Sequence, residues 1–70
     1  MVFKNLQAEM VRRSVTPVAI SKVINKTEKS TRAKLSGRYP FTLPEAKAVR
    51  DTFFPGMDLD FLFFQSDNTN

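Results

Sequence analysis

Basic side chains are concentrated in the middle of this chain. The segment from Lys22 to Arg38 carries six Lys and Arg residues and one acid, Glu28, whereas residues 51–70 carry four Asp and no Lys or Arg. A cationic segment of this density suits a polyanion such as double-stranded DNA, because each cationic group can replace a phosphate counterion. A solvated helix face would produce the same pattern, so the charge alone leaves both interpretations open.

The chain offers little for catalysis or metal binding. Its 70 residues include no His and no Cys, which excludes imidazole general-base chemistry, disulfides and thiolate zinc sites. Asp58 and Asp60 stand two residues apart and would point to different sides of a helix. Gly37 and Gly56 are isolated, so a Gly-rich phosphate loop is missing. We predict no enzymatic activity, no cofactor, no metal site and no small-molecule substrate.

Two short helices are predicted to position the basic segment. Thr16-Pro17 is a strong helix start, because a Thr side chain caps free amides and Pro at the first helical position loses no hydrogen bond. Asn25 tolerates the left-handed conformation that ends a helix, and Thr27 caps a second helix that reaches Leu35. This pair, at about residues 16–36, can place its second helix in a major groove about 12 Å wide.

Three further helices complete the predicted fold. Apolar residues at steps of three and four predict the first helix, the Thr-x-x-Glu capping box at Thr42 starts the fourth, and Asp58 caps the fifth. Leu43 is expected to belong to the buried stripe of the fourth helix. The five helices are predicted at about residues 3–13, 17–24, 27–35, 43–54 and 58–64. They imply an all-α class, with one compact domain over residues 1–64 and a polar tail at residues 65–70.

Several short stretches of the chain occur in an order and spacing known from one family. They are Val15-Thr16, Ile20-Ser21-Lys22-Val23-Ile24, Thr27-Glu28-Lys29-Ser30-Thr31, Leu35-Ser36-Gly37 and Leu59-Asp60-Phe61-Leu62-Phe63. In these stretches the sequence resembles the Cro/phage-repressor helix-turn-helix family, the lambda-repressor-like domains. Short phage-encoded members from Gram-positive hosts are the most similar, since Arg32-Ala33-Lys34-Leu35-Ser36-Gly37 leads here into Phe41-Thr42-Leu43-Pro44-Glu45-Ala46.

The resemblance implies a five-helix lambda-repressor-like helix-turn-helix domain that binds operator DNA and regulates transcription, commonly at a lysis–lysogeny switch. It places the base-reading positions on Glu28, Lys29, Arg32 and Ala33, with Ser30 nearby. With the helix cap and the flanking basic side chains, the expected DNA contacts are Thr27, Glu28, Lys29, Ser30, Arg32, Ala33, Lys34 and Arg38. A weak homodimer would place two copies of the second hairpin helix in successive major grooves about 34 Å apart.

Three departures from the usual family residues support an alternative. Pro17 stands where many relatives carry a Gln that touches the DNA backbone, Glu28 is a carboxylate at the groove-facing end, and Thr31, expected to be half-buried, replaces an Ile or Phe. Val18 is expected to be exposed. Pro17, Val18 and Glu28 can therefore form a protein-binding surface instead. The chain would then be an antirepressor or modulator of repression that binds the DNA-binding domain of a partner phage repressor.

Aromatic residues are frequent in the last third of the chain. A helix over residues 58–64 turns Leu59, Leu62 and Phe63 inward. It leaves Phe61 and Phe64 near the surface, where they are predicted dimer contacts. The alternative is that a small core simply uses large residues.

Apolar runs are too short for a membrane protein. None approaches the roughly 20 apolar residues that a bilayer span requires, and the first residues lack the apolar region and cleavage site of a signal peptide. We expect a cytoplasmic protein of a bacterial host cell, without a membrane partner.

Overall fold

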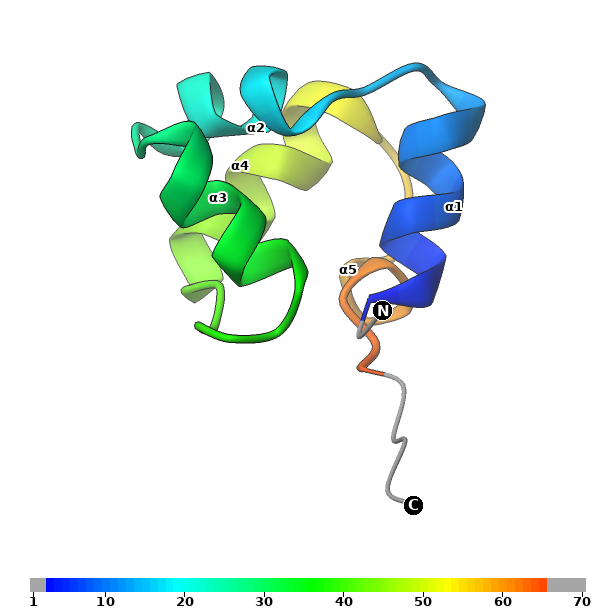
Figure 1. The fold of residues 1–70 in the computed structure, drawn as a ribbon. Coiled ribbons are helices and arrows are strands. Elements are labelled where there is room, and N and C mark those ends of the chain that lie inside the picture. The colour runs from blue at the N-terminus through cyan, green and yellow to red at the C-terminus, as the bar shows by residue number, and fades with distance from the viewer. Residues whose placement is uncertain (1–2, 66–70) are drawn as a thin grey trace.

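The computed structural model describes residues 3–65, which contain five helices and the segments that connect them (Figure 1). They are α1 (Lys4–Arg12), α2 (Pro17–Ile24), α3 (Glu28–Leu35), α4 (Leu43–Phe53) and α5 (Leu59–Leu62). No strand occurs within these residues. The predicted all-α class with five helices is therefore confirmed for residues 3–65, while most of the predicted tail, residues 66–70, lies outside them.

Side-chain caps set where four of the helices begin. Each cap accepts a hydrogen bond from the amide three residues later: Thr16 from Ala19 (3.2 Å), Thr27 from Ser30 (3.0 Å), Thr42 from Glu45 (3.2 Å) and Asp58 from Phe61 (2.9 Å). The Thr42 amide also donates to Glu45 Oε1 at 3.1 Å, which completes the predicted capping box. These bonds satisfy amides that lack helical partners, which explains the starts of α2, α3, α4 and α5.

The first and last helices are shorter than predicted. α1 begins at Lys4 because Phe3 has a non-helical backbone, with φ −100° and ψ 73°, as its ring packs into the core. α5 is a single turn that ends at Leu62, because the backbone of Phe63 turns away with φ −103° and ψ 20°. Phe64 therefore follows the helix instead of completing it.

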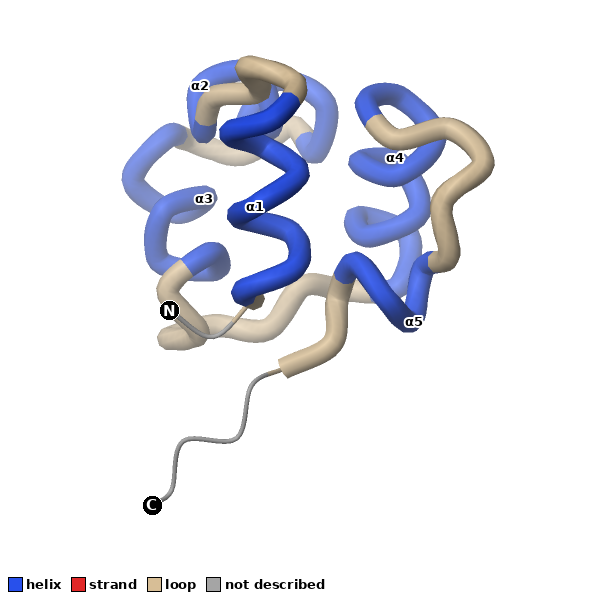
Figure 2. The backbone as a smooth tube through the Cα atoms, turned by 90° about the vertical axis from the view of Figure 1, so that its right-hand side faces the viewer, coloured by secondary structure: helices blue, strands red, loops and turns tan. Residues whose placement is uncertain are grey.

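The core lies where the helices meet. α2 packs against α3 and α4, and α5 packs against α1 and α4; Figure 2 shows α1 in front, with α3 and α4 on either side of it. The largest group of buried apolar residues in contact consists of Phe3, Leu6, Met10, Ile20, Ile24, Leu35, Val49, Phe54 and Leu62. Phe3, Phe41 and Phe63 pack edge to face, with centroids 5.1 to 5.8 Å apart. These rings join the start of α1 to the end of α5.

One predicted core residue lies on the surface. Leu43 is 60% exposed, whereas Ala46 and Val49 in the following turns of α4 are buried. The prediction was wrong because Leu43 occupies the first helical position, at the end of the packed face. The periodicity of a sequence does not show where a neighbouring helix stops covering that face.

A residue with a left-handed backbone conformation forms the turn between α2 and α3. Asn25 has φ 60° and ψ 46°, and its N–H donates to the carbonyl of Ser21. The Lys26 amide donates to the same carbonyl at 3.0 Å. The Ser21 hydroxyl in turn donates to the Val18 carbonyl at 2.6 Å. The turn is therefore short, and these hydrogen bonds help to fix the direction of α3 relative to α2.

Candidate nucleic-acid interface

A hollow of about 470 Å³ runs along the exposed side of α3. We call it the α3 hollow; it is lined by Thr27, Lys29, Ser30, Arg32, Ala33, Ser36, Arg38 and Tyr39. Six of the eight residues predicted to contact DNA line this one surface. Glu28 lies beside it, paired with Arg32, while Lys34 points elsewhere. The structure thus brings most of the predicted site together.

The end of α3 folds back so that the loop after it joins the hollow. Gly37 has φ 91°, a left-handed conformation that side chains disfavour, and its amide donates to the Lys34 carbonyl at 3.1 Å. The Arg38 amide then donates to the Ala33 carbonyl at 2.9 Å. This turn sets Arg38 and Tyr39 against the end of α3. Sequence reasoning missed Ser36 and Tyr39, because helix patterns do not give the path of a loop.

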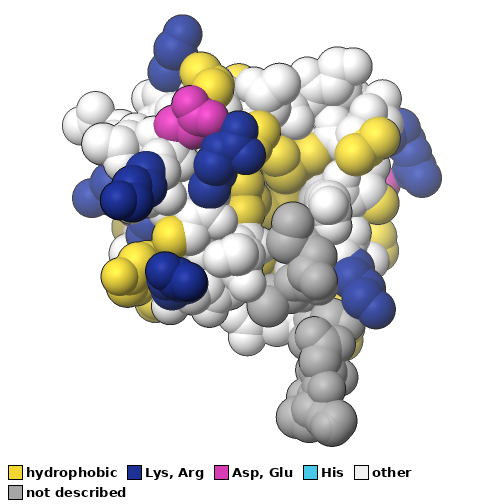
Figure 3. Space-filling view, viewed as in Figure 1, with side chains coloured by type: hydrophobic (Ala, Val, Ile, Leu, Met, Phe, Trp, Pro, Cys, Tyr) yellow, Lys and Arg dark blue, Asp and Glu magenta, His cyan; other side chains and the backbone are white. Residues whose placement is uncertain are grey.

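Exposed cations dominate this side of the molecule. Lys29, Arg32 and Arg38 line the hollow, and Lys22 and Lys26 are exposed on α2 and the turn. Figure 3 shows Lys and Arg side chains over the side of the molecule where α3 lies, with an acidic side chain among them. The predicted positive segment is therefore a positive surface, apart from Lys34. Such a surface attracts polyanions by replacing their counterions.

Thr31 anchors the opposite side of α3. It is fully buried, and its hydroxyl donates to the Thr27 carbonyl at 2.9 Å, so burial leaves no polar atom unsatisfied. The prediction of a half-buried position was therefore wrong, because the whole side chain is buried. Because Thr31 faces inward, its neighbours Ser30 and Arg32 are directed toward the hollow.

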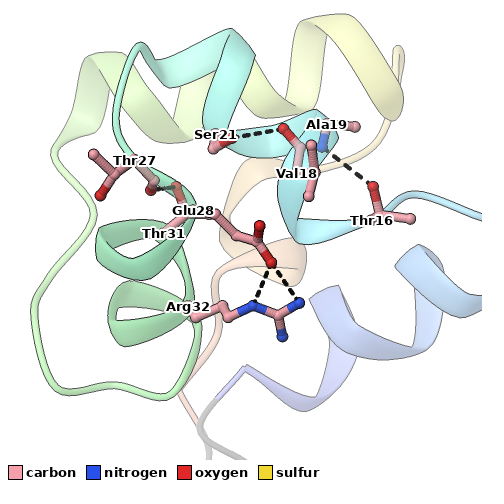
Figure 4. A network of polar contacts seen from close by, with 8 residues as sticks. All are labelled: Thr16, Val18, Ala19, Ser21, Thr27, Glu28, Thr31 and Arg32. Carbon is pink, nitrogen blue, oxygen red and sulfur yellow. Dashed lines mark hydrogen bonds and ion pairs between the residues drawn. The ribbon is translucent and has the colours of Figure 1, made fainter.

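Glu28 and Arg32 form an ion pair one helical turn apart. Arg32 Nε donates to Glu28 Oε2 at 2.8 Å, and Arg32 Nη2 lies 2.7 Å from the same oxygen (Figure 4). Both side chains are largely exposed, so the pair contributes little to stability, about 0.3–0.5 kcal/mol. Its consequence is geometric, because it favours one orientation of the guanidinium at the rim of the hollow. Glu28 also lies at the amide end of α3, where a negative charge is favourable.

Lys34 departs from the prediction that it contacts DNA. Its ammonium lies 3.0 Å from Glu45 Oε1 and donates to the Pro40 carbonyl at 3.0 Å, and both charged side chains are only 11% exposed. It also lies 6.0 Å from the centre of the Phe41 ring. Lys34 therefore joins α3 to the start of α4 and has no free ammonium for a phosphate. The sequence signal was ambiguous because a basic residue at the end of a helix suits either role.

The Glu45 carboxyl has a lowered pKa. Burial acts to raise this pKa, but the hydrogen bond from the Thr42 amide and the hydrogen bond and charge of Lys34 outweigh it and bring the pKa below the ordinary 4.5. The folded state therefore binds this proton more weakly than the unfolded state. The resulting stability is present above the ordinary pKa and is lost as pH falls through the lowered one.

A Glu45→Gln variant tests this contribution. We expect wild type to be more stable than the variant at neutral pH, and the difference to shrink as pH falls below 4.5, because protonated Glu45 carries no charge to pair with Lys34. Urea unfolding across this pH range measures both free energies. If the difference in unfolding free energy between wild type and Glu45→Gln were the same at every pH, the lowered pKa of Glu45 would be contradicted.

The residues predicted for partner binding lie next to this surface. Val18, on the first turn of α2, is 41% exposed, and Figure 4 places it near the Glu28–Arg32 pair. Pro17 lines a second hollow of about 330 Å³, which is largely apolar and is bordered by Val15, Leu35 and Arg32. Figure 3 shows apolar side chains in this depression between α3 and α1. We call it the α1–α3 hollow.

The predicted dimer contacts are exposed. Phe61 and Phe64 are both on the surface, as expected, and the Phe61 carbonyl accepts a hydrogen bond from Asn5 Nδ2 at 3.0 Å. This bond ties α5 to α1. Both rings are therefore accessible at the surface.

Comparisons with protein-family models, with curated proteins and with solved structures give no match. Among residues 3–65, no helix combines the length and the apolar character needed to cross a membrane. These residues also contain no group of three or more acidic side chains placed to hold a metal ion.

Proposed function

We propose that the chain is a non-enzymatic, sequence-specific DNA-binding regulator of transcription with a lambda-repressor-like helix-turn-helix at about residues 16–36. The observation that carries this proposal is the α3 hollow, where Lys29, Arg32 and Arg38 surround short side chains. An α-helix with small residues and cations on its outer side suits a major groove about 12 Å wide. Phosphates and base edges then lie within reach of the same helix.

The parts of this surface have separate tasks. Lys29 and Arg38, with the exposed Lys22 and Lys26, bind phosphates and orient the protein. Arg32, held by Glu28, reaches base edges. A weak homodimer through Phe61 and Phe64 would pair two such helices on a two-fold site.

Selection from a pool of random duplexes tests the proposal. The purified chain is incubated with the pool at low salt, and bound duplexes are recovered and sequenced over several rounds. We expect one short motif to be enriched and to bind the protein more tightly than a scrambled duplex. Recovery of duplexes without a shared motif would show that α3 does not read sequence.

A second candidate function is favoured by the apolar surface beside α3. Exposed Val18 and the α1–α3 hollow, lined by Pro17, offer apolar contacts, and Glu28 can pair with a basic residue of a partner. On this candidate the chain is an antirepressor or modulator of repression. It would bind the DNA-binding domain of a phage repressor and occlude its recognition surface.

Val18→Asp tests this second candidate. A buried contact at Val18 predicts a one-to-one complex with the repressor encoded beside this chain, weakened by at least about 1 kcal/mol in the variant. Calorimetry measures the affinity, and circular dichroism checks that the variant is folded. If wild type binds no such repressor at tens of micromolar and Val18→Asp instead loses DNA binding, the second candidate fails and the first is supported.

A further inference from the structure

We propose that Glu28 and Arg32 act together as one reader that recognises a single G·C base pair. The inference rests on the proposed function, because it requires α3 to lie in a major groove. It deepens that function by assigning a specificity-determining role to Glu28, the one acid of the basic segment.

The ion pair leaves a defined set of groups free. Glu28 Oε2 takes both Nε and Nη2 of Arg32, at 2.8 and 2.7 Å. Within residues 3–65, Glu28 Oε1 and Arg32 Nη1 have no other hydrogen bond, and Figure 4 shows Nη1 pointing away from the carboxylate. One acceptor therefore lies beside outward-directed donors, namely Nη1 and the second hydrogen of Nη2.

This order of groups complements one base-pair edge. In the major groove, G·C presents two acceptors, guanine N7 and O6, followed by one donor, cytosine N4. Nη1 and Nη2 of Arg32 can donate to the guanine while Oε1 of Glu28 accepts from the cytosine. An A·T pair presents a different order: adenine N7 accepts, adenine N6 donates, thymine O4 accepts, and the thymine methyl follows. On A·T, Glu28 would therefore face an acceptor or a methyl group instead of a donor.

The position of the pair on α3 supports the same role. Glu28 and Arg32 are four residues apart and share one side of the helix. Thr31 is buried on the side of α3 that packs against α2, whereas the side chains of Glu28 and Arg32 are 46% and 61% exposed. Because the two side chains are joined before binding, less side-chain freedom is lost when they meet a base pair. The pair is thus both exposed and oriented.

A base-pair series on the selected duplex tests this reader. The full chain is titrated with duplexes that carry each of the four base pairs at the position nearest Arg32. Wild type should prefer G·C by roughly tenfold or more. In Glu28→Gln most of this tenfold preference for the G·C duplex should be lost. The affinity for the A·T duplex should rise relative to it, because an amide pairs with adenine N6 and N7. Asp60→Asn, which removes one negative charge from exposed α5, should keep the G·C preference.

A modified base supplies a second readout. N4-methylcytosine replaces the groove-facing N4 hydrogen by a methyl group, so it should weaken wild type and leave Glu28→Gln nearly unaffected. If no duplex binds wild type, the proposed function fails and this inference fails with it. If a selected duplex binds but wild type and Glu28→Gln show the same base preference and the same response to N4-methylcytosine, the composite reader is wrong while the DNA-binding function stands.

Discussion

Lys34→Ala should lower the free energy of unfolding by about 3 kcal/mol, although Lys34 belongs to the most basic helix of the chain. The substitution leaves the Glu45 carboxylate without its cation in a position that is only 11% exposed, and it removes the hydrogen bond to the Pro40 carbonyl. A chain of 70 residues is held by about 4–10 kcal/mol in total, so this loss is large. Urea unfolding followed by circular dichroism measures it.

Lys29→Ala is the matched control for this prediction. Lys29 is on the same helix but is exposed, so its removal should change stability by less than about 0.5 kcal/mol. The double variant Lys34→Met with Glu45→Gln should recover part of the loss, because it removes both charges and keeps an acceptor for the Thr42 amide. Equal stability of Lys34→Ala and Lys29→Ala would show that Lys34 is solvated rather than paired.

Arg32→Ala and Arg38→Ala should weaken DNA binding in different ways. On the proposed function Arg32 reaches a base edge, so its loss should cost about 1–3 kcal/mol on the selected duplex and much less on random DNA. Arg38 lies at the end of the α3 hollow, where the proposed function assigns it a phosphate contact, so its loss should weaken both duplexes alike. Fluorescence anisotropy with the two duplexes gives the four affinities. Equal losses on both duplexes for both variants would contradict base reading by α3.

Local hydrogen bonding explains how much of the fold was predictable from the sequence. Thr16, Thr27, Thr42 and Asp58 are caps whose partners lie three residues away, so the starts of four helices follow from sequence alone. The end of α5 was not predictable in this way. Phe63 leaves the helix to pack its ring against Phe3 and Phe41, which are distant in sequence.

The candidate site was predictable where it consists of one helix and not where it depends on tertiary contacts. Lys29, Ser30, Arg32 and Ala33 share a surface because helix geometry requires it. Whether Lys34 pairs with Glu45 or stays exposed depends on where the start of α4 lies, and no local sequence pattern gives that position. The same reason applies to Leu43 and Tyr39. The Glu28–Arg32 pair is an intermediate case, since its spacing allows the contact but does not require it.

The dependence of duplex affinity on salt is the most direct test of DNA binding by this surface. We predict that affinity for a duplex falls by tenfold or more between about 50 and 200 mM salt, because three or more cations replace phosphate counterions. The double variant Lys29→Ala with Arg38→Ala should reduce the slope by about 2, whereas Lys4→Ala with Lys47→Ala, exposed on α1 and α4, should keep it. A flat salt dependence, or no binding of any duplex by micromolar protein at low salt, would contradict the proposed function.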